Sequence, residues 1–305
     1  MREFIKPMLA DLLPEIHPLT NAQLLPKLLP LLRCSSCGKC RFDIHRDEST
    51  MVDIQTHCVV VCDECQSCFK YENGILEVLV EKASGLSIAQ KSNFIGLVAN
   101  SYQSGWRSWC MSVFCGQKCP NAMEAEKIIQ LIEFDELPEN PVFVDFGTSH
   151  GFYAIAIARK LKEMNSAGFV IAIDFSKKML RQAVVAAEKN SVSERIIWIL
   201  ADVEACPLQN ESAVRVTCGG SLNEYRHPEK AIQESARVLK RGGSYITMNL
   251  FRKNNWSGWL LSFVHLLSGL VFFSQENWNR LFTGGGFRIV QQEIKGIVMF
   301  TASKK

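Results

Sequence analysis

The sequence carries little net charge and no clear export signal. Its 34 lysines and arginines face 31 aspartates and glutamates, so the formal net charge is only +3, too small by itself to indicate nucleic-acid binding. Glu3, Asp11 and Glu15 interrupt the N-terminus, which therefore does not read as a signal peptide. Internal repeats and low-complexity tracts are also absent. We expect a cytoplasmic, reducing location, with a plastid or membrane-peripheral one as the alternative.

What is present is enough for one large domain and a small one. The chain has 305 residues, of which 47% are hydrophobic and 21% charged. The sequence divides into a proline- and leucine-rich segment (1–33), a cysteine-rich zinc-ribbon-like module (34–80), a connector or cap (81–120) and a larger α/β domain (121–305).

Short apolar runs alternate with amphipathic stretches after about residue 121, which is typical of a doubly wound α/β domain with a mostly parallel sheet. Ser176 is a good N-cap for one helix. Pro228 suits the first turn of another, which we expect to run to about Leu239 and to be ended by Gly242 and Gly243. The expected strands are 142–146, 169–173, 196–200, 213–218 and 244–250, with a last pair at 287–291 and 296–302.

The first of these strands leads into the glycine turn VDFGTSHG, which ends at Gly151. Gly147 permits a turn that other residues resist. Backbone N–H groups at the start of the following helix can receive an anionic group. The turn departs from the common Gly-x-Gly-x-x-Gly pattern, because Ser149 stands at the middle glycine. The motif taken alone is weak, since a glycine turn before a helix needs no ligand.

Acidic residues follow the next two strands. Asp174 lies 29 residues after Asp145, where a carboxylate can accept both hydroxyls of a ribose. Phe175 can pack on an adenine ring, and Asp202 can accept from its amino group. The structural alternatives are a helix N-terminal acid for Asp174 and a loop acid for Asp202. Together with the glycine turn, these residues predict a nucleoside-containing ligand.

These motifs resemble class I S-adenosylmethionine-dependent methyltransferases of the ubiquinone/menaquinone-biosynthesis type, also called type 11, from about residue 98 to the end. The segments that carry the resemblance are VDFGTSHG, AIDFSKKMLRQA, ILADVEACPL, GGSLNEYRHPEKAIQESARVLKRGGSYI and GIVMFTASKK. The YQSGWR segment and the cysteine region before it are similar to a cyanobacterial and plastid subgroup.

The resemblance implies a Rossmann-like, seven-stranded sheet with an antiparallel final hairpin, and S-adenosylmethionine bound at its carboxyl edge. The sequence differs from the family at Ser149 and at Val214, where an acid is common. The predicted cofactor-binding residues are Asp145, Gly147, Thr148, Gly151, Asp174, Phe175, Asp202, Val203, Cys218 and Gly219.

Twelve cysteines are many for this length, and six of them cluster at 34, 37, 40, 62, 65 and 68. Cys34 with Cys37 and Cys62 with Cys65 form two pairs separated by 24 residues, a spacing that predicts a four-thiolate structural zinc site. Cys40 and Cys68 extend both pairs, so other sets of four stay open. The alternatives are an iron–sulfur cluster, a redox role or no bound metal.

Residues for the methyl acceptor are expected after the fourth strand. If a general base is used, Glu224 is the first candidate and His150 the second. Asn223, Tyr225 and His227 complete the polar group there, and each has a plain loop role as its alternative. Tyr102 and Trp106 are predicted to cap the pocket.

Three functions are compatible with these features. The first is a methyltransferase for a small, apolar or quinone-like acceptor, in which the nearly uncharged stretch 256–273 lines the pocket or touches a membrane surface. The second is an RNA methyltransferase that uses the cysteine module for its substrate, and the third is a non-catalytic binding protein. The cysteine segment has no basic run, which disfavours RNA; its basic residues Arg33, Lys39, Arg41, Arg46 and Lys70 are balanced by Asp43, Asp47, Glu48, Asp53, Asp63, Glu64 and Glu72. The oligomeric state is not predicted.

Overall fold

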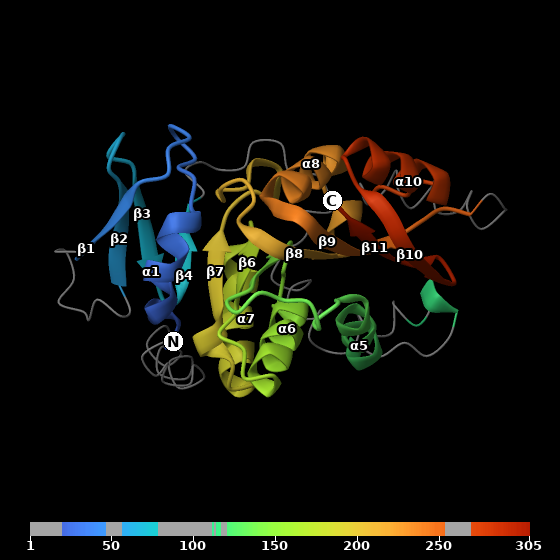
Figure 1. Cartoon of the computed structure of the whole chain (residues 1–305), viewed down its shortest axis with the longest axis horizontal. Coiled ribbons are helices and arrows are strands. Elements are labelled where there is room, and N and C mark those ends of the chain that lie inside the picture. The colour runs from blue at the N-terminus through green and yellow to red at the C-terminus, as the bar shows by residue number, and fades with distance from the viewer. Residues whose placement is uncertain (1–19, 47–56, 79–111, 113, 117–120, 254–269) are drawn as a thin grey trace, which may run out of the picture.

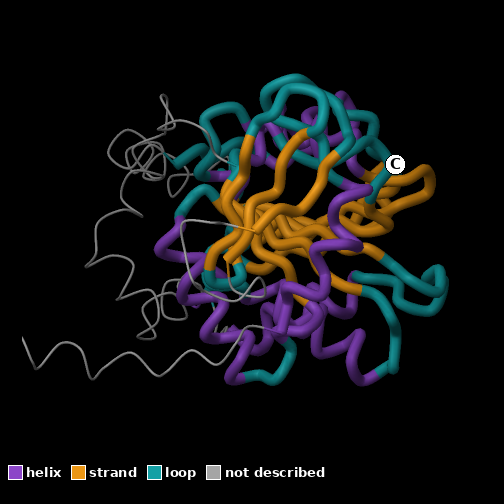
Figure 2. Tube along the Cα trace, turned by 90° about the vertical axis from the view of Figure 1, so that its left-hand side faces the viewer, coloured by secondary structure: helices purple, strands orange, loops and turns teal. Residues whose placement is uncertain are grey.

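A computed structural model describes residues 20–46, 57–78, 112, 114–116, 121–253 and 270–305 (Figure 1). Within these ranges, eleven strands form one sheet in the order β1-β2-β3-β4-β7-β6-β5-β8-β9-β11-β10. In Figure 2 the strands form a central layer with helices on either side. The predicted α/β fold class is confirmed.

Seven of the strands form the predicted methyltransferase-like sheet. Five run parallel: β7 (Ile196–Leu200), β6 (Phe169–Asp174), β5 (Val142–Phe146), β8 (Ala213–Gly219) and β9 (Leu239–Leu250). Two complete the sheet as an antiparallel hairpin: β11 (Val298–Lys304) and β10 (Arg288–Lys295). Because parallel strands end at the same edge, the loops after β5, β6 and β8 meet there.

Helices cover both faces of this sheet. One buried apolar cluster includes residues of α5 (Asn121–Leu131), α6 (Phe152–Glu163) and α7 (Lys177–Lys189). The cluster on the other face includes residues of α8 (Pro228–Val238) and α10 (Gln275–Gly284). Ser176 caps α7 as predicted, since its hydroxyl accepts from the backbone N–H of Met179.

The end of α8 differs from the prediction. The helix stops at Val238, and Leu239 already pairs with Ala213 at the start of β9. Gly242 and Gly243 therefore do not end the helix. They lie inside β9, where Ala213 pairs with Leu239 but Arg215 pairs with Ser244, and Gly242 takes a φ of 75° within this irregularity. The glycines accommodate extra residues in the strand.

The cysteine module continues the same sheet. Its strands are β1 (Phe42–Arg46), β2 (His57–Cys62), β3 (Cys68–Glu72) and β4 (Ile75–Glu77), each antiparallel to the next. β4 then runs parallel to β7, with Ile75 opposite Trp198. The sequence indicated two modules but gave no sign that they share strand pairing.

The stretch 256–273 is described only at 270–273, which contain no helix. No helix in the described ranges has the length and apolar character that a membrane span requires. The rest of this stretch, and with it the predicted contact with the pocket or a membrane surface, lies outside the described residues.

Candidate functional site

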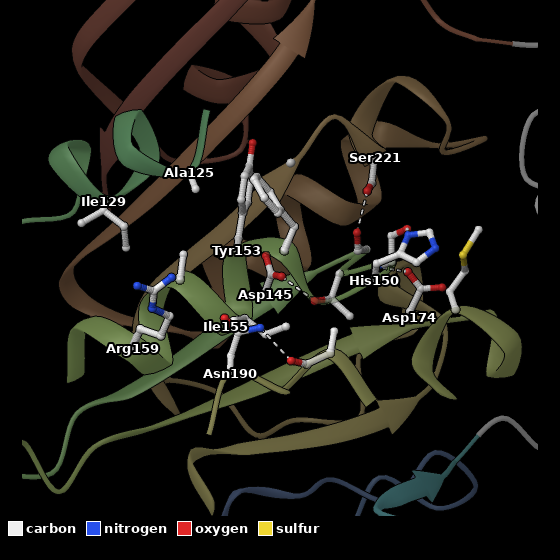
Figure 3. A pocket seen from close by; sticks show the side chains of 18 of the residues that line it. Ala125, Ile129, Asp145, His150, Tyr153, Ile155, Arg159, Asp174, Asn190 and Ser221 are labelled. Atoms are coloured by element: carbon white, nitrogen blue, oxygen red, sulfur yellow. Dashed lines mark hydrogen bonds between the residues drawn. The ribbon is translucent and has the colours of Figure 1, made fainter. Parts of the chain in front are cut away.

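A cavity of about 740 Å³ opens at the carboxyl ends of β5, β6 and β8 (Figure 3). The glycine turn after β5 forms part of its wall. The first turns of α6 and the loop after β8 form other parts. Its lining includes nine of the predicted site residues: Asp145, Gly147, Thr148, His150, Asp174, Phe175, Gly219, Glu224 and Tyr225. Ser149, at the middle position of the turn, lines it too.

Asp145 is a buried carboxylate at the end of β5. Its oxygens accept hydrogen bonds of 2.6 Å from the hydroxyls of Thr148 and Thr217. Burial raises the pKa of Asp145 to about 6, although these hydroxyls favour the charged form. Asp145 thus fixes the turn and the neighbouring strand from beneath the cavity.

Asp174 ends β6 and is also buried. One carboxylate oxygen accepts from the backbone N–H of Ser149 and the other from that of Ser176, both at 2.8 Å. Burial raises the pKa of Asp174 to about 6. Each carboxylate oxygen has a second lone pair, so both can still accept from a ligand in the cavity.

The turn between these acids depends on two glycines. A Cβ at Gly147 would lie 2.3 Å from the Ser221 Oγ, and one at Gly151 would lie 2.6 Å from the Trp198 ring. Both residues have positive φ, at 62° and 75°. Ser149 adopts a φ of 50° as well, so it takes the left-handed conformation for which glycine is common. The turn therefore keeps its shape without the middle glycine.

The sequence did not single out Glu124 and Tyr153. The Tyr153 hydroxyl donates a 2.5 Å hydrogen bond to Glu124, which is 1% exposed on α5. The Tyr153 ring lines the cavity and covers Gly219, where a Cβ would come within 2.2 Å of it. The available signal was an acid on the apolar face of a helix: Glu124 lies four and seven residues before the buried Ile128 and Leu131.

The predicted acceptor residues separate into two groups. Glu224 and Tyr225 line the cavity with His150, and the Tyr225 side chain is 3% exposed. Figure 3 shows His150 and Asp174 on the side of the cavity near Ser221.

Asn223 and His227 lie away from the cavity lining. The Asn223 amide donates to the carbonyls of Leu250 and Val271 and accepts from the Leu250 N–H. It therefore joins the loop after β8 to the end of β9 and to the chain near residue 271. His227 Nδ1 lies 3.3 Å from Glu229.

The remaining predicted cofactor residues also lie outside the lining. Asp202 is exposed, and its side chain accepts from the Glu204 N–H at the start of a short 3-10 helix. Val203 and Cys218 are buried. Tyr102 and Trp106 lie outside the described residues, so their predicted capping role stays a prediction.

The structure brings together four of the clustered thiols. The Sγ atoms of Cys34, Cys37, Cys62 and Cys65 all lie within 4.8 Å of one another. Cys34 and Cys65 are 3.7 Å apart, as are Cys37 and Cys62. The thiols of the other two cysteines face backbone carbonyls instead, Cys40 that of Gly38 and Cys68 that of Gln66.

Two similar turns present these thiols. In each, the N–H after the second cysteine donates to the carbonyl of the first: Gly38 to Cys34 at 2.9 Å and Gln66 to Cys62 at 2.8 Å. Both donors have positive φ. Zinc–sulfur bonds of about 2.3 Å in a tetrahedron place sulfurs about 3.8 Å apart, so the donor set fits zinc.

The comparisons with known proteins agree with this geometry. Residues 143–243 match the family model described as "Methyltransferase domain". An uncharacterised chloroplastic methyltransferase of Arabidopsis thaliana is 26% identical over 214 residues, which are 68% of this chain and 58% of that protein. A 2-phytyl-1,4-naphtoquinone methyltransferase of Nostoc punctiforme is 28% identical over 112 residues, 37% of this chain and 47% of that protein. The chain thus spans about half the length of these two relatives.

A solved structure shares the fold. It is a geranyl diphosphate methyltransferase in complex with S-adenosylmethionine, with a TM-score of 0.51 and 13% identity over 61% of this chain and 85% of that chain. At this identity the likeness concerns the fold alone. It agrees with the predicted Rossmann-like fold.

Proposed function

We propose that residues 143–243, which match the family model described as "Methyltransferase domain", belong to a class I methyltransferase domain, and that the chain transfers the methyl group of S-adenosylmethionine to a small apolar, quinone-like acceptor. The observation that carries the proposal is the position of Asp174. Its buried carboxylate ends β6 beside the cavity and is oriented by two backbone N–H groups. A carboxylate held in this place is suited to the two hydroxyls of a ribose.

The residues present fit the cofactor. The lining combines acceptors for hydroxyl groups, a glycine turn without room for side chains, and apolar groups such as Phe175 and Met179. Asp174 would hold the ribose, Phe175 would pack on the adenine, and the turn at 147–151 would receive the carboxylate. The bound cofactor supplies an electrophilic methyl group on a sulfonium.

Methyl transfer is an in-line displacement, so the protein's contribution is to align the acceptor and exclude water. The buried side chains of Tyr153 and Tyr225 form parts of the cavity wall that would align the acceptor and exclude water. An acceptor that loses a proton needs a nearby base. Glu224 and His150 line the cavity and are the candidates, with Glu224 the first choice.

The quinone-like acceptor rests on two further facts. The Nostoc relative is named as a naphthoquinone methyltransferase. Apolar residues, among them Ile129, Phe152 and Ile155, line the cavity, and Figure 3 shows Ile129 and Ile155 on the other side of it from Asp174. Such a lining suits a flat or hydrocarbon-bearing acceptor.

The acceptor class is tested by supplying the purified chain with methyl-labelled S-adenosylmethionine and a cell extract, then separating RNA, protein and lipid. We expect label in the lipid fraction, and a Glu224→Gln variant should reduce it if Glu224 is the base. Label in RNA would overturn the acceptor proposal in favour of the second candidate. Cofactor binding without transfer to any fraction would favour a binding protein.

We also propose that Cys34, Cys37, Cys62 and Cys65 bind one structural Zn²⁺. Their sulfur spacing supports this, as does the size of a module too small to fold on its core alone. Metal analysis of the purified chain should give about one zinc per chain. A metal-free, folded chain, or iron instead of zinc, would contradict the assignment.

For the location of the protein, the chloroplastic name of the Arabidopsis relative supports a plastid as the alternative to the predicted cytoplasm. Fractionation of cells that express the tagged full-length protein decides between them.

A further inference from the structure

Arg33 joins the cysteine module to the segment that follows β7. It directly precedes Cys34, and its backbone N–H donates to the Pro207 carbonyl at 2.9 Å. Its guanidinium lies 3.4 Å from the Cys206 carbonyl and 3.7 Å from the Glu234 carboxylate. A single residue beside a thiol of the cluster thus contacts both this segment and α8.

The contact extends over several neighbouring residues. Leu32 forms a bridge with Leu208, and Gln209 donates from its backbone to the Leu31 carbonyl at 2.8 Å and from its side chain to the Pro30 carbonyl at 2.7 Å. Cys206 and Leu208 are fully buried in the same apolar cluster as Cys34. The segment 206–209 therefore packs against the residues that lead directly into the cysteine module.

Glu234 anchors the segment from the other side. It accepts from the Cys206 N–H at 2.9 Å and pairs with Arg237, whose guanidinium also donates to the carbonyls of Cys206 and Leu208. The segment is thus held between Arg33 and α8. Asp202, whose predicted contact with adenine stays a prediction because the residue is exposed and outside the cavity lining, lies at the start of the same connection.

A second set of contacts, by strand pairing and ion pairs, connects the module to the Asp174 side of the cavity. β4 pairs with β7, and the Val78 N–H donates to the Leu200 carbonyl at 3.0 Å. Lys177, next to the Ser176 that donates to Asp174, forms ion pairs with Glu72 and Glu77 of the module. Figure 1 shows the module lying along β7, at the far end of the sheet from the final hairpin.

We infer that the cysteine module is a positioning element for the adenosine half of the cofactor, with Arg33 and the four-thiolate site holding the 202–209 segment that follows β7. The inference rests on the proposed function, since it concerns how tightly that same site binds S-adenosylmethionine. The module acts through the backbone it holds and not by contact with the ligand.

The physical reason is the size of the module. Its four strands are short, and their buried residues pack into the apolar cluster shared with the rest of the sheet, so a metal bound by the thiolates would fix mainly the two turns that carry the cysteines. Without the metal, the turn that contains Cys34 is released, and Arg33 and Leu32 lose their fixed position. The 202–209 segment then samples other conformations. Each binding event must order it again, and this entropy cost lowers the affinity for the cofactor.

The test measures S-adenosylmethionine affinity by calorimetry on the full chain, with metal content and thermal melting followed in parallel. Cys37→Ser removes an exposed thiol of the cluster, and Cys40→Ser and Cys68→Ser are matched controls because both are exposed thiols outside it. We expect the Cys37 variant to lose metal and to bind at least ~10-fold more weakly, which corresponds to about 1.4 kcal/mol. Both controls should retain wild-type metal content and affinity.

Arg33→Ala keeps the thiols and tests the contact alone. Arg41→Ala is its control, since Arg41 lies nearby in the cysteine module, is exposed and forms a 3.7 Å ion pair with the exposed Glu64. We expect a ~5-fold weaker affinity for Arg33→Ala with full metal content, and a higher KM for the cofactor with unchanged kcat, since about 1 kcal/mol is typical of such a contact. Arg33→Lys, which keeps the charge, should recover part of the affinity.

The outcomes separate this inference from the proposed function. If the wild-type chain does not bind S-adenosylmethionine, the proposed function fails and the inference with it. If the wild type binds but the Cys37 and Arg33 variants bind equally well, only the inference is overturned. An Arg33→Ala variant that melts earlier yet keeps full affinity would also overturn it, because the contact would then be merely structural.

Discussion

The Thr217 hydroxyl donates a 2.6 Å hydrogen bond to Asp145, its direct partner across the parallel pairing of β8 and β5. The carboxylate also accepts from Thr148 in the turn above it. One buried acid thus links the two strands whose ends form the centre of the cavity.

Burial of Asp145 should make stability depend on pH. Its pKa is about 6 in the folded chain and about 3.9 when unfolded, so the folded state holds the proton more tightly. The stabilisation from this group is full below pH 4 and is lost as the pH rises through 6. The two-unit difference corresponds to about 3 kcal/mol.

An Asp145→Asn variant removes that titration. Urea unfolding gives the free energy of unfolding of both proteins at pH 4 and pH 7. The value for the variant minus that for the wild type should be up to about 3 kcal/mol larger at pH 7 than at pH 4. A difference in unfolding free energy that does not change with pH would contradict the role assigned to the buried carboxyl.

Cofactor affinity should also depend on pH, through Asp174. The ionised carboxylate is the better acceptor for ribose hydroxyls, and its pKa is about 6. Affinity should therefore fall as the pH drops below 6, by up to about tenfold per unit. Calorimetry from pH 5 to 8 checks this, and Asp174→Asn should flatten the profile.

Gly151 and Gly242 offer a matched pair of substitutions. Both have a φ of 75°, but a Cβ at Gly151 would lie 2.6 Å from the buried Trp198 ring, whereas a Cβ at Gly242 meets nothing within 4 Å. Alanine costs about 1–2 kcal/mol at either site because of the left-handed backbone. Gly151→Ala should cost about 1–3 kcal/mol more, since the ring must move. Equal losses in thermal unfolding would show that the contact has no cost.

The Tyr153–Glu124 hydrogen bond should stabilise the cavity wall. Tyr153→Phe removes the hydroxyl that donates to a carboxylate with 1% exposure, and we expect a loss of about 1–3 kcal/mol in unfolding free energy. Glu124→Gln keeps an oxygen acceptor and should lose less. If Glu124→Gln is less stable than Tyr153→Phe, the negative charge of Glu124 contributes more to stability than this hydrogen bond does, which contradicts the expectation.

Substitution of Asn223 should affect acceptor binding more than cofactor binding. Its amide makes hydrogen bonds to Leu250 and Val271 and does not line the cavity. Asn223→Asp replaces the N–H donors by an oxygen facing two carbonyls, so it should disturb this junction more than Asn223→Ser. We expect a higher KM for the acceptor with little change in S-adenosylmethionine affinity, and the reverse pattern would contradict this.

Much of this structure could be predicted from the sequence, because strand periodicity and strand-end chemistry are local signals. The apolar run 142–146 and the N-cap Ser176 required no tertiary information. The end of α8 was harder to predict, because a pair of glycines is typical of a helix end. Here Gly242 and Gly243 lie in an irregular part of a strand instead.

The parts that could not be predicted depend on contacts between distant segments. No local sequence signal indicates that β4 pairs with β7, or that the Asn223 amide donates hydrogen bonds to the carbonyls of Leu250 and Val271. The cysteine spacing left several sets of four ligands open. Only the folded turns bring Cys34, Cys37, Cys62 and Cys65 together and leave Cys40 and Cys68 outside.

The central claim is that Asp174 holds the ribose of S-adenosylmethionine at the end of β6. Calorimetry of the purified chain at pH 7.5 or so, with Asp174→Ala beside the wild type, tests it most directly; losing charge-assisted bonds to two hydroxyls should weaken binding by at least ~100-fold, or about 2.7 kcal/mol. Circular dichroism of the variant confirms that it is folded. A folded variant that binds S-adenosylmethionine as tightly as the wild type would contradict the account.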